Sequence, residues 1–236
     1  MKKHMKRMTA PRSWSVTRKT SHWVTKPRPG PHAMMDSIPI ETVLRDMLKV
    51  CDNAREAKLI LSSRNIAVDG RVVTDYKFPV GLMDVVTIKK TKLSYRMLMD
   101  YKGRLQLAPI DENESGWKLA RVDNKTTVRG GKTQVTLHDG RNILLPMDQY
   151  KTGDVLKIEV PSQKVLKAFT LDKGSVALLT GGSHPGSLHT VDSYQVKRGS
   201  AANIVTFKEG LTTIEKNVFV VGDKTPEITL LEAKVA

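Results

Sequence analysis

The sequence predicts an α+β protein that is mostly β. Three observations lead to this fold class: a helical hydrophobic period between residues 40 and 61, many short Val/Ile/Leu/Thr runs after Tyr95, and basic charge gathered at the N-terminus. We expect a basic extended N-terminal tail over residues 1–37, an α/β domain over 38–93, a central β-barrel-like domain over 94–168 and a C-terminal β-barrel over 169–236.

The N-terminal 37 residues carry much of the positive charge. The chain has a net charge of +15, and this segment contributes nine basic groups against one acid, Asp36. Trp14 and Trp23 lie among these cations, and a merely solvated tail, which is the alternative, rarely carries tryptophan. Because cations displace condensed counterions from phosphates and indoles stack on unpaired bases, a nucleic acid is the expected partner. We expect the tail to be unordered away from that partner.

A transit peptide is the other reading of this segment, but the run Pro27-Arg28-Pro29-Gly30-Pro31 breaks any amphipathic helix there. No apolar block resembles a secretory signal, and the longest uncharged run, residues 174–191, contains too much Gly and Pro to span a membrane. Cys51 is the single cysteine, so no intramolecular disulfide and no Cys₄ or Cys₂His₂ zinc site can form.

Two helices are predicted next. Apolar residues recur at helical spacing from residue 40 to 48 and form one stripe, listed as Ile40, Val43, Leu44, Met47 and Leu48. A second helix begins after Asn53, which can cap it together with Glu56. Asn65 is expected to take the left-handed conformation that ends this helix.

The period then changes to that of strands. Asp69-Gly70 predicts a type I′ hairpin turn between residues 66–68 and 72–73. Residues 79–81 predict a bend and residues 85–88 another strand. The basic run 89–92 and the stretch 161–167 predict domain boundaries, and the evenly spaced strands after residue 95 favour small barrels.

No catalytic or metal-binding constellation is apparent. Gly131-Lys132-Thr133 lacks the upstream glycine of a phosphate-binding loop and is expected to be a hairpin turn. Gly181-Gly182-Ser183 lacks the last glycine of a nucleophile elbow. The six histidines show no metal spacing, and the acidic cluster 111–114 is expected to be a solvated loop. We therefore single out no catalytic or metal-binding residues, although a site assembled from residues distant in the sequence leaves no such motif.

The helix pair is the expected RNA-binding face. Arg45 and Lys49 should project from the first helix, and Arg55 and Lys58 from the second, near a helix N-terminus that attracts phosphate. The alternative is an ordinary solvated surface, since acids are mixed among these cations. With the tail included, the predicted RNA-binding residues are Lys2, Lys3, Lys6, Arg7, Arg12, Trp14, Arg18, Lys19, Trp23, Arg28, Arg45, Lys49, Asn53, Arg55, Lys58, Arg64 and Arg71.

Several of these segments resemble known families. The block from Pro39 to Ile88 resembles the S4-type RNA-binding domain, through Leu44-Arg45, Arg55-Glu56-Ala57-Lys58 and Ile66-Ala67-Val68-Asp69-Gly70-Arg71-Val72. The opening Lys3-His4-Met5-Lys6-Arg7-Met8-Thr9-Ala10-Pro11-Arg12-Ser13-Trp14 resembles that of the archaeal and eukaryotic small-subunit ribosomal protein S4e family. So do Arg28-Pro29-Gly30-Pro31-His32, Gly81-Leu82-Met83-Asp84-Val85 and Tyr95-Arg96 with Asp100-Tyr101-Lys102-Gly103-Arg104. Residues 174–186 are similar to a KOW motif, in which hydrophobic positions lead to a required glycine, here Gly186, of an SH3-like barrel.

The resemblance covers nearly the whole chain, and its length resembles archaeal members. It implies a structural, non-enzymatic component of the small ribosomal subunit in the cytoplasm. Its partners would be small-subunit ribosomal RNA and neighbouring ribosomal proteins, with no membrane, small-molecule substrate or cofactor. Ala33 and Val73 depart from the family's more basic pattern, so these two positions are not expected to contact phosphate.

Two alternatives remain open at this point. An RNA-modifying enzyme could use an S4-type anchor as pseudouridine synthases do, but Gln106 follows Gly103-Arg104-Leu105 where their chemistry needs a carboxylate. A transcription-associated RNA-binding factor could carry the KOW-type barrel.

Overall fold

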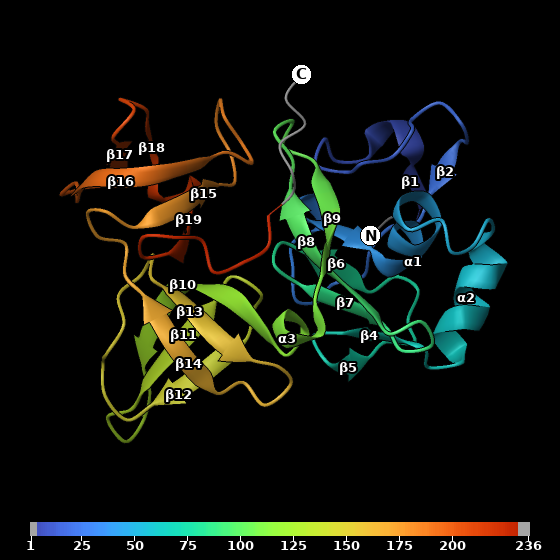
Figure 1. Cartoon of the computed structure of the whole chain (residues 1–236), viewed down its shortest axis with the longest axis horizontal. Coiled ribbons are helices and arrows are strands. Elements are labelled where there is room, and N and C mark those ends of the chain that lie inside the picture. Colours follow the sequence, from blue (N-terminus) through green and yellow to red (C-terminus); the bar gives the residue numbers. More distant parts are fainter. Residues whose placement is uncertain (1–3, 231–236) are drawn as a thin grey trace. The chain divides into compact units, whose positions relative to one another are not determined.

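The structure, a computed structural model, describes residues 4–230. It confirms a mostly β protein with few helices (Figure 1). The described residues divide into two compact units: unit 1 comprises residues 4–99 with 104–116, and unit 2 comprises residues 100–103 with 117–230. Each is described by itself below. None of the helices between residues 4 and 230 combines the length and apolar character needed to cross a bilayer.

Unit 1 is built on a five-stranded antiparallel sheet of order β5-β4-β7-β8-β9. Its strands are β4 (Ile66–Val68), β5 (Arg71–Val72), β7 (Val85–Ile88), β8 (Leu93–Met99) and β9 (Leu105–Ile110). Two two-stranded pairs accompany it: β1 (Met5–Lys6) with β2 (Trp23–Val24), and β3 (Ser37–Pro39) with β6 (Pro79–Gly81). Residues 79–81, predicted as a bend, are therefore a strand.

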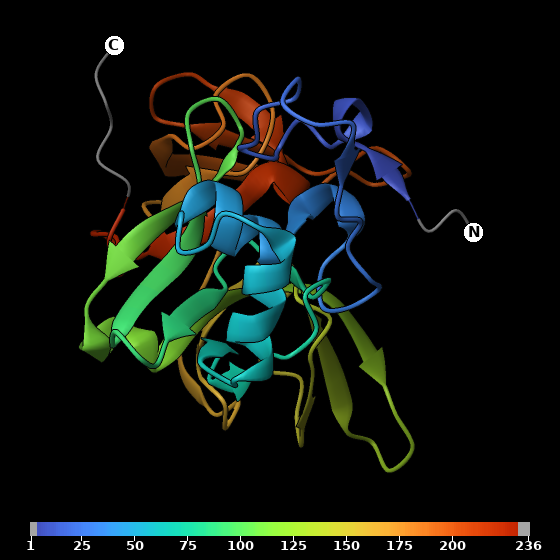
Figure 2. The same cartoon turned by 90° about the vertical axis from the view of Figure 1, so that its right-hand side faces the viewer.

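The helix pair lies where the sequence predicts it (Figure 2). The first helix starts as α1 (Ile40–Thr42) and widens into the π-helical turn η3 (Val43–Met47), in which the Leu48 amide donates to the Val43 carbonyl. The second is α2 (Ala54–Ser62), where the Glu56 carboxylate accepts from the amides of Asp52 and Asn53.

The turns follow from residues that tolerate positive φ. Asp69 and Gly70 have φ of 49° and 73°, as a type I′ hairpin requires. At the end of α2 the left-handed residue is Arg64, with φ 58°, so the expectation for Asn65 was wrong by one position. Asn65 instead bonds the Ser63 hydroxyl through its side-chain amide.

The N-terminal segment is part of the core of unit 1, which corrects the expectation of an extended, unordered tail. Trp14 is 1% exposed and Met5, Ala10 and Val24 are buried with it, in the same apolar cluster as Leu44 of the first helix. Trp14 forms a parallel bridge with Leu105 of β9, whose amide donates to the Ser13 carbonyl. Two 3₁₀ turns, η1 (Arg7–Thr9) and η2 (Met34–Asp36), complete the segment.

The run 89–92 also differs from its prediction. It forms a tight turn between β7 and β8, with Lys92 at φ 56°, and β8 continues the sheet of unit 1. The compact units divide at Gly116 and Trp117. The acidic cluster precedes this point as the short helix α3 (Glu112–Ser115), in which Glu114 pairs with the fully buried Arg96 at 2.8 Å. Burial lowers the pKa of Arg96, and Glu114 opposes that shift.

Unit 2 consists of two five-stranded antiparallel sheets, of order β12-β11-β10-β13-β14 and β18-β17-β16-β15-β19. The first sheet contains β10 (Trp117–Thr127), β11 (Thr133–Leu137), β12 (Asn142–Leu145), β13 (Val155–Glu159) and β14 (Val165–Phe169). The second contains β15 (Val176–Leu179), β16 (Leu188–Gln195), β17 (Ile204–Phe207), β18 (Thr212–Ile214) and β19 (Val218–Gly222), with the 3₁₀ turn η4 (Glu215–Asn217) before β19. Gly131-Lys132-Thr133 lies at the β10–β11 hairpin, as predicted.

Candidate nucleic-acid interface

The predicted RNA-binding residues divide into those that face solvent and those used inside the fold. Of the predicted residues within 4–230, the exposed cations without an ion pair are Lys6, Arg12, Lys19, Lys49, Arg55, Lys58, Arg64 and Arg71. Lys2 and Lys3 lie outside the described residues. The exposed cations on and after the helix pair therefore keep their charge available to a polyanion.

Two predicted contacts of the N-terminal segment, Arg7 and Arg18, serve the fold. Arg7 is 4% exposed and bonds Thr17, Ser21 and Asp46, the last at 3.5 Å. Arg18 donates to three backbone carbonyls, those of Met8, Ala10 and Pro11. The guanidinium groups of Arg7 and Arg18 donate hydrogen bonds to backbone carbonyls of the N-terminal segment, and these bonds stabilise its folded conformation.

Trp14 must be removed from the list of stacking residues. Its indole is buried against the core of unit 1, so neither ring face is available to a base. Trp23 shows the opposite arrangement, because its side chain is 56% exposed although its backbone is held in β2. Arg28 is exposed and paired with Asp75 at 2.8 Å.

A cavity of about 620 Å³ brings four predicted residues together. Its lining residues come from the N-terminal segment and from residues 45–54, namely Arg7, Ser15, Thr17, Thr20, Ser21, Arg45, Asp46, Lys49, Cys51, Asp52, Asn53 and Ala54. Four hydroxyls and three cations line a space with two carboxylates. Hydroxyls and cations are the groups that position phosphate oxygens, while the carboxylates tie down the cations.

Arg45 is the cation that this arrangement holds most firmly. Its guanidinium lies 3.0 Å from Asp46 and 3.1 Å from Glu41. The hydrogen bond with Asp46 raises the pKa of Arg45 despite its partial burial. Burial raises the pKa of the Cys51 thiol in the same cavity, so this cysteine is a protonated apolar group. Asn53 is used as the cap of α2, and its exposed side chain bonds Glu56.

The second helix presents Arg55 and Lys58 to solvent. The Lys58 ammonium lies 4.3 Å from the centre of the Tyr76 ring, and Lys77 lies 5.4 Å from the same ring. Sequence analysis missed Tyr76 and Lys77. The available signal was an aromatic residue beside a lysine in the loop between β5 and β6, close to the expected basic face.

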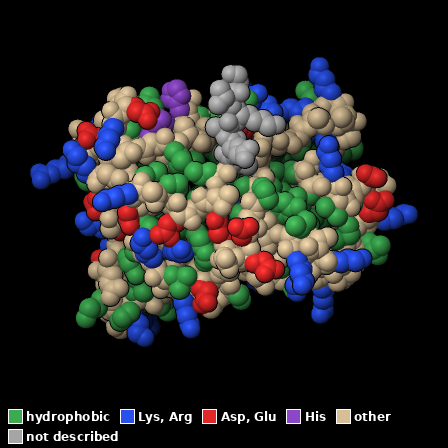
Figure 3. All heavy atoms as spheres, viewed as in Figure 1, with side chains coloured by type: hydrophobic (Ala, Val, Ile, Leu, Met, Phe, Trp, Pro, Cys, Tyr) green, Lys and Arg blue, Asp and Glu red, His purple; other side chains and the backbone are tan. Residues whose placement is uncertain are grey.

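Basic and acidic groups are interspersed on one face of the structure. On the face drawn in Figure 3, Lys and Arg side chains alternate with Asp and Glu instead of forming one continuous basic field. This charge distribution fits RNA binding at particular positions, where cations, hydroxyls and aromatic rings lie together, better than binding by overall electrostatic attraction alone.

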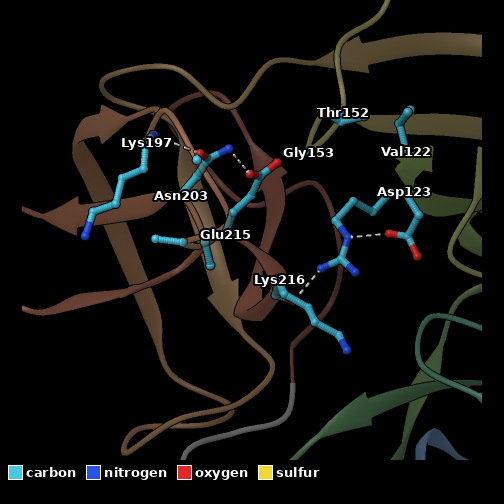
Figure 4. Close-up of a pocket in the computed structure, with 12 residues that line it drawn as sticks. Val122, Asp123, Thr152, Gly153, Lys197, Asn203, Glu215 and Lys216 are labelled. Atoms are coloured by element: carbon cyan, nitrogen blue, oxygen red, sulfur yellow. Dashed lines mark hydrogen bonds and ion pairs between the residues drawn. The ribbon is translucent and has the colours of Figure 1, made fainter. Parts of the chain in front are cut away.

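Unit 2 has a polar pocket of about 550 Å³ of its own (Figure 4). Its polar groups largely pair with one another: Arg121 bonds Asp123 and the Lys216 carbonyl, and Asn203 bonds Glu215. Burial and the neighbouring Glu215 raise the pKa of Tyr194, which bonds the same carboxylate. None of the predicted RNA-binding residues lines this pocket.

A Ser187–His189–Glu209 chain in unit 2 was also missed. Ser187 Oγ lies 2.7 Å from His189 Nε2, and Glu209 lies 2.7 Å from His189 Nδ1. However, the Ser187 hydroxyl donates its proton to the His184 carbonyl at 2.6 Å, so it accepts from the imidazole. This is the reverse of the proton flow that activates a serine nucleophile. Among residues 4–230, no three His, Cys, Asp or Glu side chains lie together in a way that could hold a metal.

A small sheet with a basic helix pair, a hydroxyl-lined cavity beside that pair and two further β-sheets are features of a modular RNA-binding protein. Family models match along the chain: the RS4NT domain over residues 1–35, the S4 domain over 39–86 and the ribosomal family S4e over 91–165. The chain belongs to the ribosomal protein S4e family.

Its relatives agree along nearly the full length. The chain is 44% identical over 233 residues to the small ribosomal subunit protein eS4 of Methanothermobacter thermautotrophicus, covering 97% of this chain and 96% of the relative. It is 44% identical over 235 residues to the eS4 protein of Archaeoglobus fulgidus, covering 98% of each. The crystal structure of 30S ribosomal protein S4e from Thermoplasma acidophilum matches with a TM-score of 0.71 and 34% identity, covering 80% of this chain and 96% of that one.

These matches confirm the family that the sequence resembles and the archaeal character of its relatives. They also confirm that the chain belongs with ribosomal structural proteins and is not an enzyme. The open alternative of an RNA-modifying enzyme is therefore set aside.

Proposed function

We propose that this protein is a structural constituent of the small ribosomal subunit, in the cytoplasm, that binds and stabilises small-subunit ribosomal RNA. The observation that carries the proposal is the helix pair of the S4 domain. There Lys49, Arg55, Arg64 and Arg71 are exposed without ion pairs among the described residues, and Lys49 also lines the hydroxyl-bearing cavity. Full-length similarity to proteins named small ribosomal subunit protein eS4 supports the same function.

The parts of the chain have different tasks in this proposal. The N-terminal segment adds Lys6, Arg12 and Lys19 to the helix-pair surface while its buried residues fix it to unit 1. The two sheets of unit 2 act as a central β-barrel-like domain and a C-terminal SH3-like barrel. The KOW-type reading of that barrel is supported by β15, which leads to the left-handed Gly186 at φ 75°. Neighbouring ribosomal proteins are the expected partners of the remaining surface.

The mechanism is neutralisation of phosphate charge at positions set by the fold. Each cation that meets a phosphate releases condensed counterions, so affinity must fall steeply as salt rises. Phosphate contacts carry no sequence information, so specificity comes from the shape of the folded RNA.

The test is binding of the full chain to small-subunit ribosomal RNA over a range of salt concentrations. Arg55→Glu combined with Lys58→Glu should weaken binding by about tenfold or more and flatten the log-log salt slope by about two. Lys164→Glu with Lys208→Glu makes the same change in net charge at exposed positions of unit 2 and is the matched control.

Equal loss in both variants would show attraction to net charge only and would contradict the helix-pair face. In a cell lysate, sedimentation with the small subunit on a sucrose gradient is expected. Sedimentation with RNA polymerase instead would favour the transcription-associated alternative.

A further inference from the structure

A second cavity of unit 1, about 360 Å³ in volume, lies beside the first helix of the pair. It is lined by His4, Met5, Trp23, Val24, Thr25, Lys26, Arg45, Tyr76 and Lys77. These residues come from three segments far apart in the sequence: the β1–β2 pair, the π-helical turn η3 and the loop before β6. The cavity therefore exists only because the N-terminal segment folds onto the S4 domain.

Two large aromatic rings, those of Trp23 and Tyr76, line this space together with the His4 imidazole, whose centre lies 5.7 Å from that of the Trp23 ring. Trp23 is held by its strand, where it pairs with Lys6, and by edge contact with His22 at 4.6 Å, yet its indole is 56% exposed. An ordered, exposed tryptophan sacrifices the stability that burial would give, since indole is among the most apolar surfaces a protein carries. The Tyr76 ring lies under the Lys58 and Lys77 ammonium groups.

The charge of the cavity is one-sided. Lys26, Arg45 and Lys77 are among its lining residues, and no Asp or Glu is. Three carboxylates outside the lining set hold it in place. Glu41, which is 2% exposed, accepts from Thr25 and Arg45, Asp46 pairs with Arg45 at 3.0 Å, and Asp75 accepts from the Lys77 amide.

Aromatic faces with cations around them suit one class of ligand. A nucleobase stacks on an aromatic ring whatever its sequence, and its phosphates are held by the surrounding cations. An apolar peptide would give the Lys77 ammonium no counter-charge, and a free phosphate would leave the rings unused.

We propose that this cavity is the binding site for a single unpaired nucleotide of the RNA, with its base against Trp23 and Tyr76 and its phosphates on Lys26 and Lys77. The proposal rests on the RNA-binding function proposed above and adds a contact that the helix-pair cations do not supply. It predicts that the protein selects RNA with a looped-out or single-stranded residue next to a folded helix.

The test uses the full chain and a single-stranded oligoribonucleotide of about eight nucleotides, within the range that one module covers, and the same sequence as a duplex. Trp23→Ala should weaken single-strand binding by about 5- to 100-fold, the effect of losing one stacked base. Trp23→Phe, which keeps a stacking face, should retain most of the affinity. Tyr101→Ala is the matched control, since Tyr101 is 54% exposed and also carries a lysine over its ring.

Fluorescence provides a second readout, which is measured first on the unchanged protein. The single-stranded RNA should quench the indole emission of the unchanged protein, and this quenching should be absent in Trp23→Phe, where only Trp14 and Trp117 remain.

The outcomes separate the two proposals. If the unchanged protein binds ribosomal RNA but Trp23→Ala and Tyr76→Ala bind single strands as it does, the nucleotide site is wrong and the RNA-binding function stands. Equal weakening on single strand and duplex would also overturn the site. If the unchanged protein binds no RNA, both proposals fail, and this is visible without any variant.

Discussion

The Lys118 ammonium lies 2.6 Å from a carboxylate oxygen of Asp139 in the interior of unit 2, and neither side chain is more than 1% exposed. Arg141 approaches the same oxygen at 3.1 Å. Burial would raise the pKa of Asp139, but Lys118, His138 and Arg141 together hold it below its usual value. The pair ties β10 to the turn between β11 and β12.

Lys118→Met should therefore destabilise unit 2 by about 3–5 kcal/mol, because it removes the closest counter-charge of a buried carboxylate. Lys118→Met combined with Asp139→Leu should cost less than the single change, since both charges leave together. Urea unfolding measures both. Lys125→Met is the control: its partner Asp148 is 58% exposed, so a loss of less than about 1 kcal/mol is expected. A single and a double variant of equal stability would contradict the buried-pair interpretation.

Gly81 is predicted to tolerate no side chain. A Cβ at this position would lie 2.4–2.6 Å from three atoms of the His32 ring, which is held at 2.9 Å from the Asp84 carboxylate. Gly81→Ala should cost about 1–3 kcal/mol of unit 1 stability in urea unfolding, as overpacking does. Gly116→Ala meets no atom within 4 Å at a φ of −81° and should be neutral or slightly stabilising. Equal stability of the two variants in urea would contradict the prediction that the His32 ring, held by Asp84, leaves no room for a side chain at position 81.

The two N-terminal tryptophans should behave oppositely. Trp14→Ala should destabilise unit 1 by about 3–5 kcal/mol, because a large buried side chain is lost from the core. Trp23→Ala should cost less than about 1 kcal/mol, because the indole is mostly exposed. For the same reason, removal of residues 1–37 should lower the stability of unit 1, contrary to a tail that can be cut without effect. Thermal unfolding of the two variants and of the truncated protein measures these changes. An unchanged unfolding midpoint after truncation would contradict the finding that the N-terminal segment is part of the core of unit 1.

Acid should weaken one contact of the C-terminal segment. Glu227 lies 2.7 Å from Lys157 and 2.8 Å from Lys167, and these hydrogen bonds lower the pKa of its carboxyl. The folded pKa is therefore below the unfolded value of about 4.3, so the contact stabilises above that pH and is lost as pH falls through the folded value.

Glu227→Gln should reduce the stability of unit 2 at neutral pH by less than about 1 kcal/mol, since the ion pairs are partly exposed. The difference should shrink in acid and vanish once the pH is below the folded pKa, because both proteins are then uncharged at this position. Urea midpoints at the two pH values measure it, and a difference that grows in acid would have the wrong sign.

The elements that were predicted correctly are those that depend on residues close together in the sequence. The helix pair follows from apolar spacing, and the hairpin follows from Asp69 and Gly70, whose positive φ values need no distant partner. The exposure of Arg55 and Lys58 on α2 follows from the same spacing.

Long-range pairing was not predictable in this way. Residues 1–37 have the composition of an unordered tail, and only contact with Leu105 shows where Trp14 lies. The run 89–92 has the composition of a linker, but β8 pairs with β7 across it. The site could not be predicted fully for the same reason. Tertiary contacts determine which residues bury Arg7, and they also bring Trp23 and Tyr76 into one cavity.

The bridge between Trp14 and Leu105 also bears on how the chain matures during synthesis. Domains generally fold in the order in which they are translated, but here a residue near the start has its partner about ninety positions later. The nascent N-terminal segment must therefore wait, with its tryptophan uncovered, until β9 has emerged from the exit tunnel. During that interval it is open to chaperones and to premature contacts, and a translational pause before residue 105 would lengthen it.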